Sequence, residues 1–324
     1  MKIAVVGCGA VGSFYGARLC RQGEEVHFLL RTDYEVVRRQ GVFIRSIQGD
    51  FRVQPKCAQK PEEIGASELV LIGLKTTANA QLPRLLPPLV GPRTAVMTLQ
   101  NGLGNEEQLA RLIPAGQILG GLCFVCLNRL QPGLIRHTDH GRIVLGEFQR
   151  PPEPRTHQLA ALFQASGVPC EVTDDLARTH WEKLVWNVPF NGLGVAGTAG
   201  YDAVQTGVVN RKAALGPCLP TDQLLADGRW ASLVRELMRE VITAAAALGY
   251  TISLEFADLQ IERTRTMGAY KASTLLDFER GFALELESLF LEPLRQARQA
   301  GVAAPCLEKL CAVLRQLDAA RACG

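Results

Sequence analysis

The feature that most constrains this chain is a glycine-rich loop between a strand pattern and a helix pattern at its start. Residues 1–6 form an apolar run typical of a buried strand, the sequence GCGAVG follows at once, and residues 13–21 continue with helical spacing. This order predicts a dinucleotide-binding βαβ unit, in which the three glycines permit a tight turn, a close approach of the pyrophosphate and close helix–strand packing. The helix N-terminus would then face the phosphates with free N–H groups. The expected cofactor-binding residues of this loop are Gly7, Cys8, Gly9, Ala10, Val11 and Gly12.

The end of the second apolar run predicts which dinucleotide binds. Residues 25–30 read as a strand, and Arg31 follows them. An acidic residue at this point would accept a hydrogen bond from the ribose 2′-hydroxyl of NAD, whereas an arginine would lie where the 2′-phosphate of NADP is expected. Arg31 therefore favours NADP. Asp33, two residues later, remains an alternative that would serve NAD.

Composition narrows the class of protein. The 324 residues are enough for two domains, and 47% hydrophobic with 21% charged residues is typical of a globular chain. A net charge of +3 with scattered lysine and arginine argues against nucleic-acid binding. We see neither an apolar run of about 18 residues that would span a membrane nor room for a signal peptide. We therefore expect a cytoplasmic protein; a homodimer is compatible with the sequence, which does not decide the oligomeric state.

The ten cysteines show no disulfide-framework spacing, and we expect reduced thiols. Cys123 and Cys126 form a CxxC pattern inside a strand-like run, where their side chains would point to opposite faces. His137 and His140 flank a predicted hairpin turn, but the sequence offers no further ligands beside them. We therefore predict no metal site.

Strand and helix patterns alternate over the first half of the chain, which predicts an α/β fold with a Rossmann-type, doubly wound parallel sheet. An all-α domain should follow, because helical periodicity dominates beyond Asp174. We place the two domains at residues 1–174 and 175–324, and leave segment 198–229 unassigned. Predicted strands are 69–74, 95–99, two or three within 117–147 around a turn at 131–133, and 169–172; predicted helices are 81–89, 105–112, 155–166, 179–188, 231–248, 254–269, 282–300 and 306–319.

Two polar residues follow strands of this predicted sheet. Lys75 comes directly after one buried strand, and Asn101 lies just beyond another, in an Asn-Gly pair. Ligands bind outside the carboxyl ends of the strands in open α/β folds. We expect Lys75 to contact a cofactor phosphate and Asn101 to bind a ribose or the substrate, although Asn-Gly is also a common turn dipeptide.

A polar stripe marks the first helix of the second domain. Lys183, Asn187 and Asn191 are spaced four residues apart, so an unbroken helix places them on one face. One cation and two amides suit a carbonyl acid, with the lysine giving a proton and the amides orienting oxygens. Pro189 should kink this helix and leaves the alignment of Asn191 open. Farther along, Ser273, Asp277 and Glu285 are each typical of surface or capping positions, although Ser273 could bind a carboxylate and Glu285 a hydroxyl.

Taken together, these motifs resemble the ketopantoate reductase (2-dehydropantoate 2-reductase) family. The resemblance extends from the GCGAVG loop to the C-terminal helices, and its most specific parts are the Lys-x-x-x-Asn-x-x-x-Asn run and the pairing of Ser273 with Asp277 and Glu285. Segment 198–229 looks longer than the corresponding family connection, and residues 192–200 are glycine-rich where the family often supplies another polar side chain.

The resemblance implies an enzyme that binds NADPH in an interdomain cleft and reduces 2-dehydropantoate to pantoate, a precursor of coenzyme A. It implies that Lys183 is the catalytic proton donor. The other implied roles are cofactor contacts for Arg31 and Lys75, and substrate contacts for Asn101, Asn187, Asn191, Ser273 and Glu285. Two alternatives stay open: a related NADP-dependent reductase of another 2-keto acid or opine, and a non-catalytic NADP-binding sensor.

Overall fold

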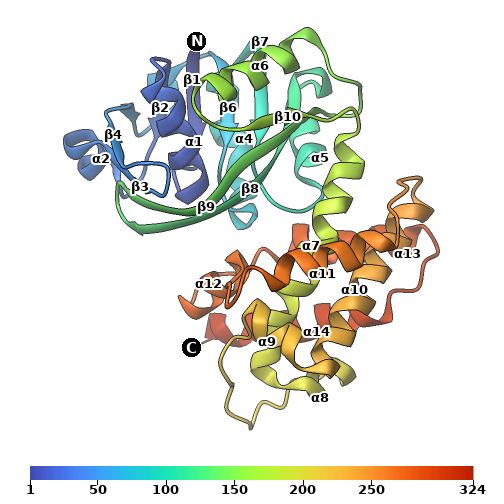
Figure 1. The fold of residues 1–324 in the computed structure, drawn as a ribbon. Coiled ribbons are helices and arrows are strands. Elements are labelled where there is room, and N and C mark those ends of the chain that lie inside the picture. Colours follow the sequence, from blue (N-terminus) through green and yellow to red (C-terminus); the bar gives the residue numbers. More distant parts are fainter. Residues whose placement is uncertain (324) are drawn as a thin grey trace. The chain divides into compact units, whose positions relative to one another are not determined.

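The computed structural model describes residues 1–323, which divide into two compact units. The first unit is Met1–Leu176, and the second begins at Ala177. Figure 1 shows the mixed sheet and helices of the first unit and the helices of the second. The predicted fold class, a Rossmann-type α/β domain followed by an all-α domain, is confirmed.

A ten-stranded sheet forms the centre of the first unit. Its order is β4-β3-β9-β8-β7-β6-β1-β2-β5, with β10 beside β9. The six strands from β8 to β5 are parallel, whereas β8 pairs antiparallel with β9, and β3 with β4. The strands are β1 (Lys2–Val6), β2 (Glu25–Leu29), β3 (Val42–Ser46), β4 (Phe51–Val53), β5 (Lys56–Ala58), β6 (Ser67–Ile72), β7 (Val90–Thr98), β8 (Ile118–Gln131), β9 (Leu134–Glu147) and β10 (Cys170–Val172).

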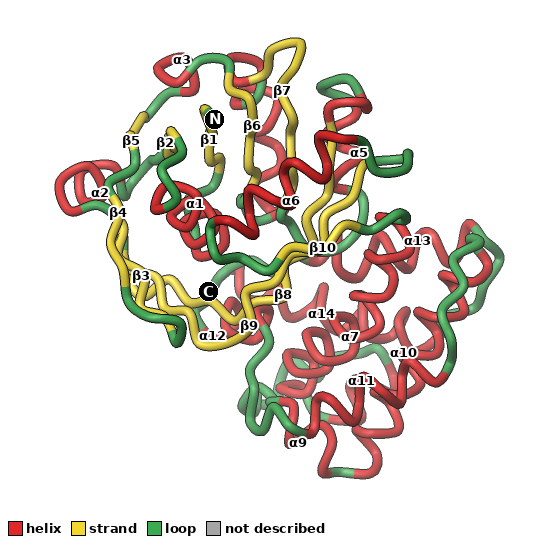
Figure 2. The backbone as a smooth tube through the Cα atoms, turned by 45° about the horizontal axis from the view of Figure 1, so that its top comes forward, coloured by secondary structure: helices red, strands yellow, loops and turns green. Residues whose placement is uncertain are grey.

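Helices cover both faces of this sheet, as the doubly wound prediction requires. On one face, α1 and α6 pack into a core with the strands, and Figure 2 shows the strands curving around α1. A separate core on the other face includes α4, α5 and the end of α3. The helices of this unit are α1 (Ala10–Arg21), α2 (Tyr34–Gln40), α3 (Pro61–Ile64), α4 (Leu82–Leu85), α5 (Asn105–Ala110) and α6 (Pro154–Ala165).

Several elements of the first unit differ from the prediction. The sheet is mixed, because the hairpin β8–β9 and the short strands β3 and β4 extend its parallel part. The predicted helix 81–89 is three short pieces, since prolines interrupt it. The predicted hairpin turn at His137 and His140 is wrong: both lie within β9, where pairing with β8 is irregular and His140 has φ 58°.

The second unit is helical throughout its described part. α7 (Leu176–Ala196) continues through Pro189 and is longer than predicted, and the predicted helix 282–300 starts only at Leu286, with a π-helical turn over Glu287–Leu291. The unassigned segment contains α8 (Tyr201–Thr206) and α9 (Thr221–Ala226), and α12 (Ser273–Glu279) was not predicted. The remaining helices are α10 (Gly228–Ala247), α11 (Glu255–Arg265), α13 (Glu292–Gln299) and α14 (Pro305–Cys323).

A buried carboxylate joins α6 to the sheet of the first unit. Glu147, the last residue of β9, is 2% exposed. Its oxygens accept hydrogen bonds from Arg155 at 2.5 and 3.0 Å, from Arg150 at 3.0 Å and from the Thr156 hydroxyl at 2.5 Å. Burial raises the pKa of Glu147, but the bonds from Arg155, Thr156 and Arg150 outweigh it, so the pKa lies below its ordinary value.

We expect Glu147→Gln to lower the free energy of unfolding by about 1.5–3 kcal/mol at pH 7, because it removes charge-assisted hydrogen bonds. A carboxylate with a lowered folded pKa stabilises the fold above its unfolded pKa, about 4.3, and that stability is lost as the pH falls below this value. The difference from wild type in urea unfolding should therefore narrow between pH 5 and pH 3. Glu171→Gln, at an exposed ion pair with Arg142, is the control and should change stability little. A Glu147→Gln difference that is constant with pH would contradict this assignment.

Candidate active site

The glycine loop between β1 and α1 has the backbone that the motif requires. Gly7 has φ +95°, and a Cβ there would lie 2.3 Å from the backbone nitrogen of Leu74. A Cβ on Gly12 would lie 2.2 Å from the Gly7 carbonyl oxygen. By contrast, no atom lies within 4 Å of a Cβ built on Gly9. The loop is therefore tightly packed on its inner side and open at Gly9, where a phosphate group would approach the backbone.

The N-terminus of α1 is suited to an anion. Gly9 is its N-cap, without a side-chain hydrogen bond, and its first turn has no acidic residue. The first N–H groups of a helix have no intrahelical partner, and the helix dipole is positive at this end. Arg31 follows β2 with an exposed side chain, at the start of a turn in which the Tyr34 N–H donates to the Arg31 carbonyl at 3.4 Å.

A network of amide side chains connects the loops that follow β6 and β7. Gln100 donates from Nε2 to the Leu74 carbonyl at 3.0 Å and to Asn79 Oδ1 at 2.6 Å. Asn79 in turn donates to Gln108 Oε1 at 2.9 Å. Because Leu74 precedes Lys75 in the chain, the network holds the backbone that carries Lys75.

The same network reaches the loop of Asn101. Asn105, at the start of α5, is 1% exposed and donates from Nδ2 to the Asn101 carbonyl at 3.1 Å. Asn79 lies 3.4 Å from Asn105 Oδ1. Lys75 and Asn101 therefore stand on neighbouring loops with a shared support, at the carboxyl ends of two adjacent parallel strands. Sequence reasoning missed Asn79, Gln100 and Asn105, whose importance lies in contacts between segments about 20 or more residues apart.

In the second unit, α7 and α12 bring three of the predicted residues together. Asn187 and Asn191 are 7% and 3% exposed, and Asn191 Nδ2 lies 3.4 Å from Asn187 Oδ1. The N–H of Thr274, in the first turn of α12, donates to Asn191 Oδ1 at 3.0 Å, and the Ser273 hydroxyl lies 3.4 Å from the same oxygen. Pro189 therefore does not remove Asn191 from the polar stripe.

Lys183 and Glu285 belong to the same unit. Lys183 lies one turn before Asn187 on α7 and is partly exposed. Glu285 is 5% exposed and directly precedes Leu286, and its carbonyl accepts from the Leu289 N–H at 3.4 Å. A buried carboxylate is costly unless it is paired, so Glu285 does not have the environment of the solvated surface residue that its sequence position suggests. Amide and hydroxyl side chains can bind the oxygens of a small acid, and a lysine ammonium can donate a proton to one of them.

The described residues contain no group of three or more histidine, cysteine, aspartate or glutamate side chains that could hold a metal ion. Burial raises the pKa of the Cys170 and Cys311 thiols to about 12. No helix in residues 1–323 has the length and hydropathy that crossing a membrane requires.

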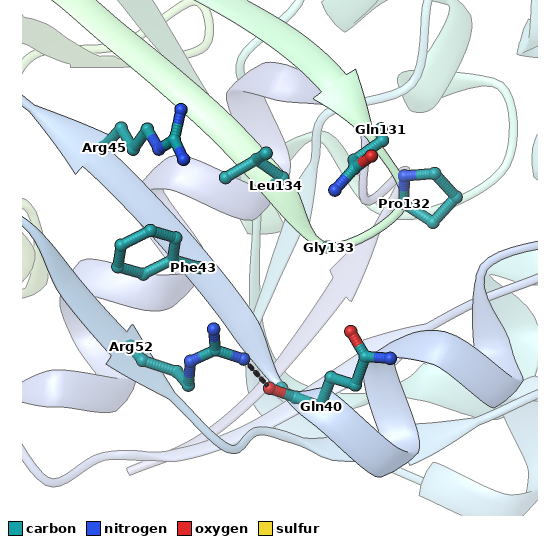
Figure 3. A pocket seen from close by; sticks show the side chains of 9 residues that line it. Gln40, Phe43, Arg45, Arg52, Gln131, Pro132, Gly133 and Leu134 are labelled. Atoms are coloured by element: carbon teal, nitrogen blue, oxygen red, sulfur yellow. Dashed lines mark hydrogen bonds between the residues drawn. The ribbon is translucent and has the colours of Figure 1, made fainter.

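A pocket of about 230 Å³ lies elsewhere on the first unit, beside the turn that joins β8 and β9 (Figure 3). Arg52 crosses its wall, stacked on Phe43 at 5.1 Å and donating to the Gln40 carbonyl at 2.5 Å. The pocket is at the C-terminal end of α2, and none of the predicted site residues lines it. We therefore do not assign the predicted chemistry to this pocket.

Comparison with known protein families shows to which family this chain belongs. A family model described as ketopantoate reductase PanE/ApbA matches residues 3–150, and the model of its C-terminal part matches residues 175–318. The chain belongs to the ketopantoate reductase family. The 2-dehydropantoate 2-reductase of Nostoc sp. is 38% identical over 323 residues, which cover 98% of this chain and 95% of the relative.

Solved structures of the ketopantoate reductase family agree with this membership. The crystal structure of 2-dehydropantoate 2-reductase from Geobacter metallireducens has a TM-score of 0.88 and 44% identity, and covers 98% of this chain and 99% of that one. A ternary structure of D-mandelate dehydrogenase with NADH and anilino(oxo)acetate has a TM-score of 0.84 and 18% identity. The match covers 99% of this chain and 100% of the dehydrogenase chain. The latter likeness shows a shared fold.

The amide network generates a prediction about dinucleotide binding. Gln100→Leu should leave the Leu74 carbonyl and Asn79 without their donor, lowering the free energy of unfolding by about 1–3 kcal/mol. It should also weaken NADPH binding in a fluorescence titration, because the loop of Lys75 loses its support.

Gln117→Leu is the matched control for this experiment. Gln117 also donates two hydrogen bonds to backbone carbonyls, those of Gly91 and Thr94, but not to the loops of Lys75 and Asn101. It should cost similar stability and leave NADPH binding unchanged. Equal loss of binding in both variants would show that the effect is only one of general stability.

Proposed function

We propose that this protein is an NADPH-dependent reductase that converts 2-dehydropantoate to pantoate. The observation that carries the proposal is the meeting of Asn187 and Ser273 at the side-chain amide of Asn191 in the second unit: its Nδ2 donates to Asn187 and its Oδ1 accepts from Ser273. This cluster occurs in a chain whose first unit has an open glycine loop and whose full length resembles 2-dehydropantoate 2-reductases.

The first unit would hold the dinucleotide. The N–H groups around Gly9, Ala10 and Val11 fit the pyrophosphate, and Arg31 and Lys75 supply positive charge for the 2′-phosphate region. Asn101 is suited to bind either a ribose hydroxyl or the substrate. When bound, NADPH supplies the hydride that reduces the keto carbon, and the protein supplies orientation and electrostatics.

The second unit would bind and protonate the substrate. We assign the proton donor role to Lys183, whose ammonium can deliver a proton to the oxygen that becomes the product hydroxyl. The amides of Asn187 and Asn191 orient substrate oxygens, and the Ser273 hydroxyl receives the carboxylate. Glu285 accepts from the primary hydroxyl of 2-dehydropantoate.

The two alternative functions explain fewer of these residues than the proposed function does. A non-catalytic NADP sensor needs the glycine loop and Arg31 but has no use for two buried asparagines joined to the start of α12. A reductase of another 2-keto acid or an opine would use the carboxylate site without needing a partner for a substrate hydroxyl. Buried Glu285 therefore favours a hydroxylated keto acid.

Lys183→Ala should lower kcat about 10²–10⁴-fold while NADPH still binds, because a positioned general acid contributes a factor of this size. Steady-state oxidation of NADPH with 2-dehydropantoate measures the first quantity, and fluorescence titration measures the second. Lys309→Ala, at an exposed lysine of α14, is the control and should change neither. Unchanged turnover in Lys183→Ala would remove Lys183 as the proton donor.

The substrate assignment is tested by a contrast between Ser273→Ala and Glu285→Ala. NADPH oxidation is measured with 2-dehydropantoate and with 2-keto acids that lack its hydroxyl. Ser273→Ala should weaken all of them, since all share the carboxylate. Glu285→Ala should lower kcat/KM for 2-dehydropantoate about 10–150-fold, the effect of losing a hydrogen bond to a charged group, and affect the others only slightly.

The outcome that opposes the assignment is equally specific. If Glu285→Ala depresses both kinds of substrate equally, Glu285 is structural and the preference for 2-dehydropantoate loses its support. If the wild-type enzyme turns over the other keto acids as fast as 2-dehydropantoate, the protein is a reductase of broader range.

A further inference from the structure

A carboxylate lies in the same turn as the arginine that should bind the 2′-phosphate. Asp33 follows Arg31 by two residues, a stretch of chain that spans at most about 7 Å. Asp33 also influences the thiol of Cys8 in the glycine loop: burial is the largest cause that raises the pKa of Cys8, and the charge of Asp33 adds to it. The carboxylate therefore lies in the turn that carries Arg31, and its charge reaches the thiol of the glycine loop.

The guanidinium of Arg129 contacts both oxygens of the Asp33 carboxylate. Arg129, near the end of β8, places Nη2 at 2.6 Å from each oxygen of Asp33 and Nε at 3.1 Å from Oδ2. Thr32 adds a hydrogen bond from its hydroxyl to Oδ1 at 3.1 Å. The side chain of Asp33 is 10% exposed and that of Arg129 is 38% exposed. A bidentate pair with one partner buried is among the stronger and geometrically better-defined ion pairs in proteins.

The position of Asp33 gives this pair a consequence for cofactor choice. A carboxylate beyond the second strand of a dinucleotide fold accepts from the 2′-hydroxyl of NAD and repels the 2′-phosphate of NADP. Between charges a few ångströms apart near a protein surface, such repulsion is large enough to weaken binding about tenfold or more. A guanidinium that binds both oxygens of Asp33 cancels the charge and occupies the acceptors.

We propose that Arg129 is a specificity-determining residue, which makes the site select NADPH by neutralising Asp33. It acts through Asp33 and is a positioning residue rather than a catalytic one. The proposal rests on the proposed use of NADPH. It adds that Arg31 alone does not set the preference: without Arg129, the same turn would present a carboxylate to the 2′-phosphate.

The test compares Kd for NADPH and for NADH, by fluorescence titration, in wild type and Arg129→Met. The NADPH preference should fall about tenfold or more, mainly through weaker NADPH binding. Higher salt should reduce this loss, because it screens the uncovered carboxylate. The double variant Arg129→Met/Asp33→Asn should recover the preference to within about threefold of wild type.

Arg142→Met is the matched control. Arg142 lies on the neighbouring strand β9, pairs with Glu171 at 2.8 Å and has a similarly exposed side chain, 40%. Its loss should leave the ratio of the two Kd values unchanged. A merely structural role for Arg129 would lower stability and weaken both cofactors together, without a salt-dependent change in their ratio.

If Arg129→Met does not fold, the single variant Asp33→Asn provides the test. This substitution removes the carboxylate and releases the guanidinium, so the NADPH preference should stay or rise. A fall in preference in Asp33→Asn, or an unchanged ratio in folded Arg129→Met, overturns the proposal. If the wild-type protein binds NADPH no more tightly than NADH, the proposed use of NADPH is wrong. If the wild type prefers NADPH but Arg129→Met keeps that preference, only the proposed role of Arg129 is wrong.

Discussion

The close approach of β1, α1 and the end of β6 determines much of the first unit. A methyl group on Gly12 would meet the Gly7 carbonyl, and one on Gly7 would meet the backbone of Leu74. Because no side chain separates them, α1 packs deep inside the curved sheet with eight of its twelve residues buried. Protein interiors are densely packed and resist small displacements, so the N-terminus of α1 is held where a phosphate would bind.

Buried amides perform the same task in both units. Gln100 supports the loop before Lys75, and Asn191 joins α7 to the first turn of α12. Each of these side chains satisfies a backbone group that would otherwise be unpaired, and leaving such a group unpaired costs about 1–3 kcal/mol. The polar residues assigned to binding are therefore carried on backbone that is fixed before any ligand arrives, which is the condition for precise positioning.

Two arginine–carboxylate groups in the first unit have similar chemistry but different effects, one on stability and one on the choice of ligand. Glu147 gathers Arg150 and Arg155 and joins α6 to the sheet, so its effect is on stability. Asp33 binds Arg129 with similarly short contacts but stands in the turn that carries Arg31. The location of a paired charge, more than the strength of the pair, decides whether it bears on folding or on ligand choice.

The sequence alone determined the elements that depend on local patterns. Glycine spacing predicted the loop at Gly7, apolar runs predicted the parallel strands, and the four-residue spacing predicted that Asn187 and Asn191 share a face of α7. These features follow from backbone geometry within about ten residues. The three-residue strands β4 and β5 are too short to carry a period, and neither was predicted.

Only the tertiary structure decided which distant residues meet. Arg129 reaches Asp33 across 96 positions of sequence, and Ser273 reaches Asn191 across 82. His137 and His140 looked like turn residues, yet the pairing of β9 with β8 and β3 keeps them within a strand. Such contacts depend on strand order and helix packing, which arise from the burial of the whole core rather than from any short stretch of chain.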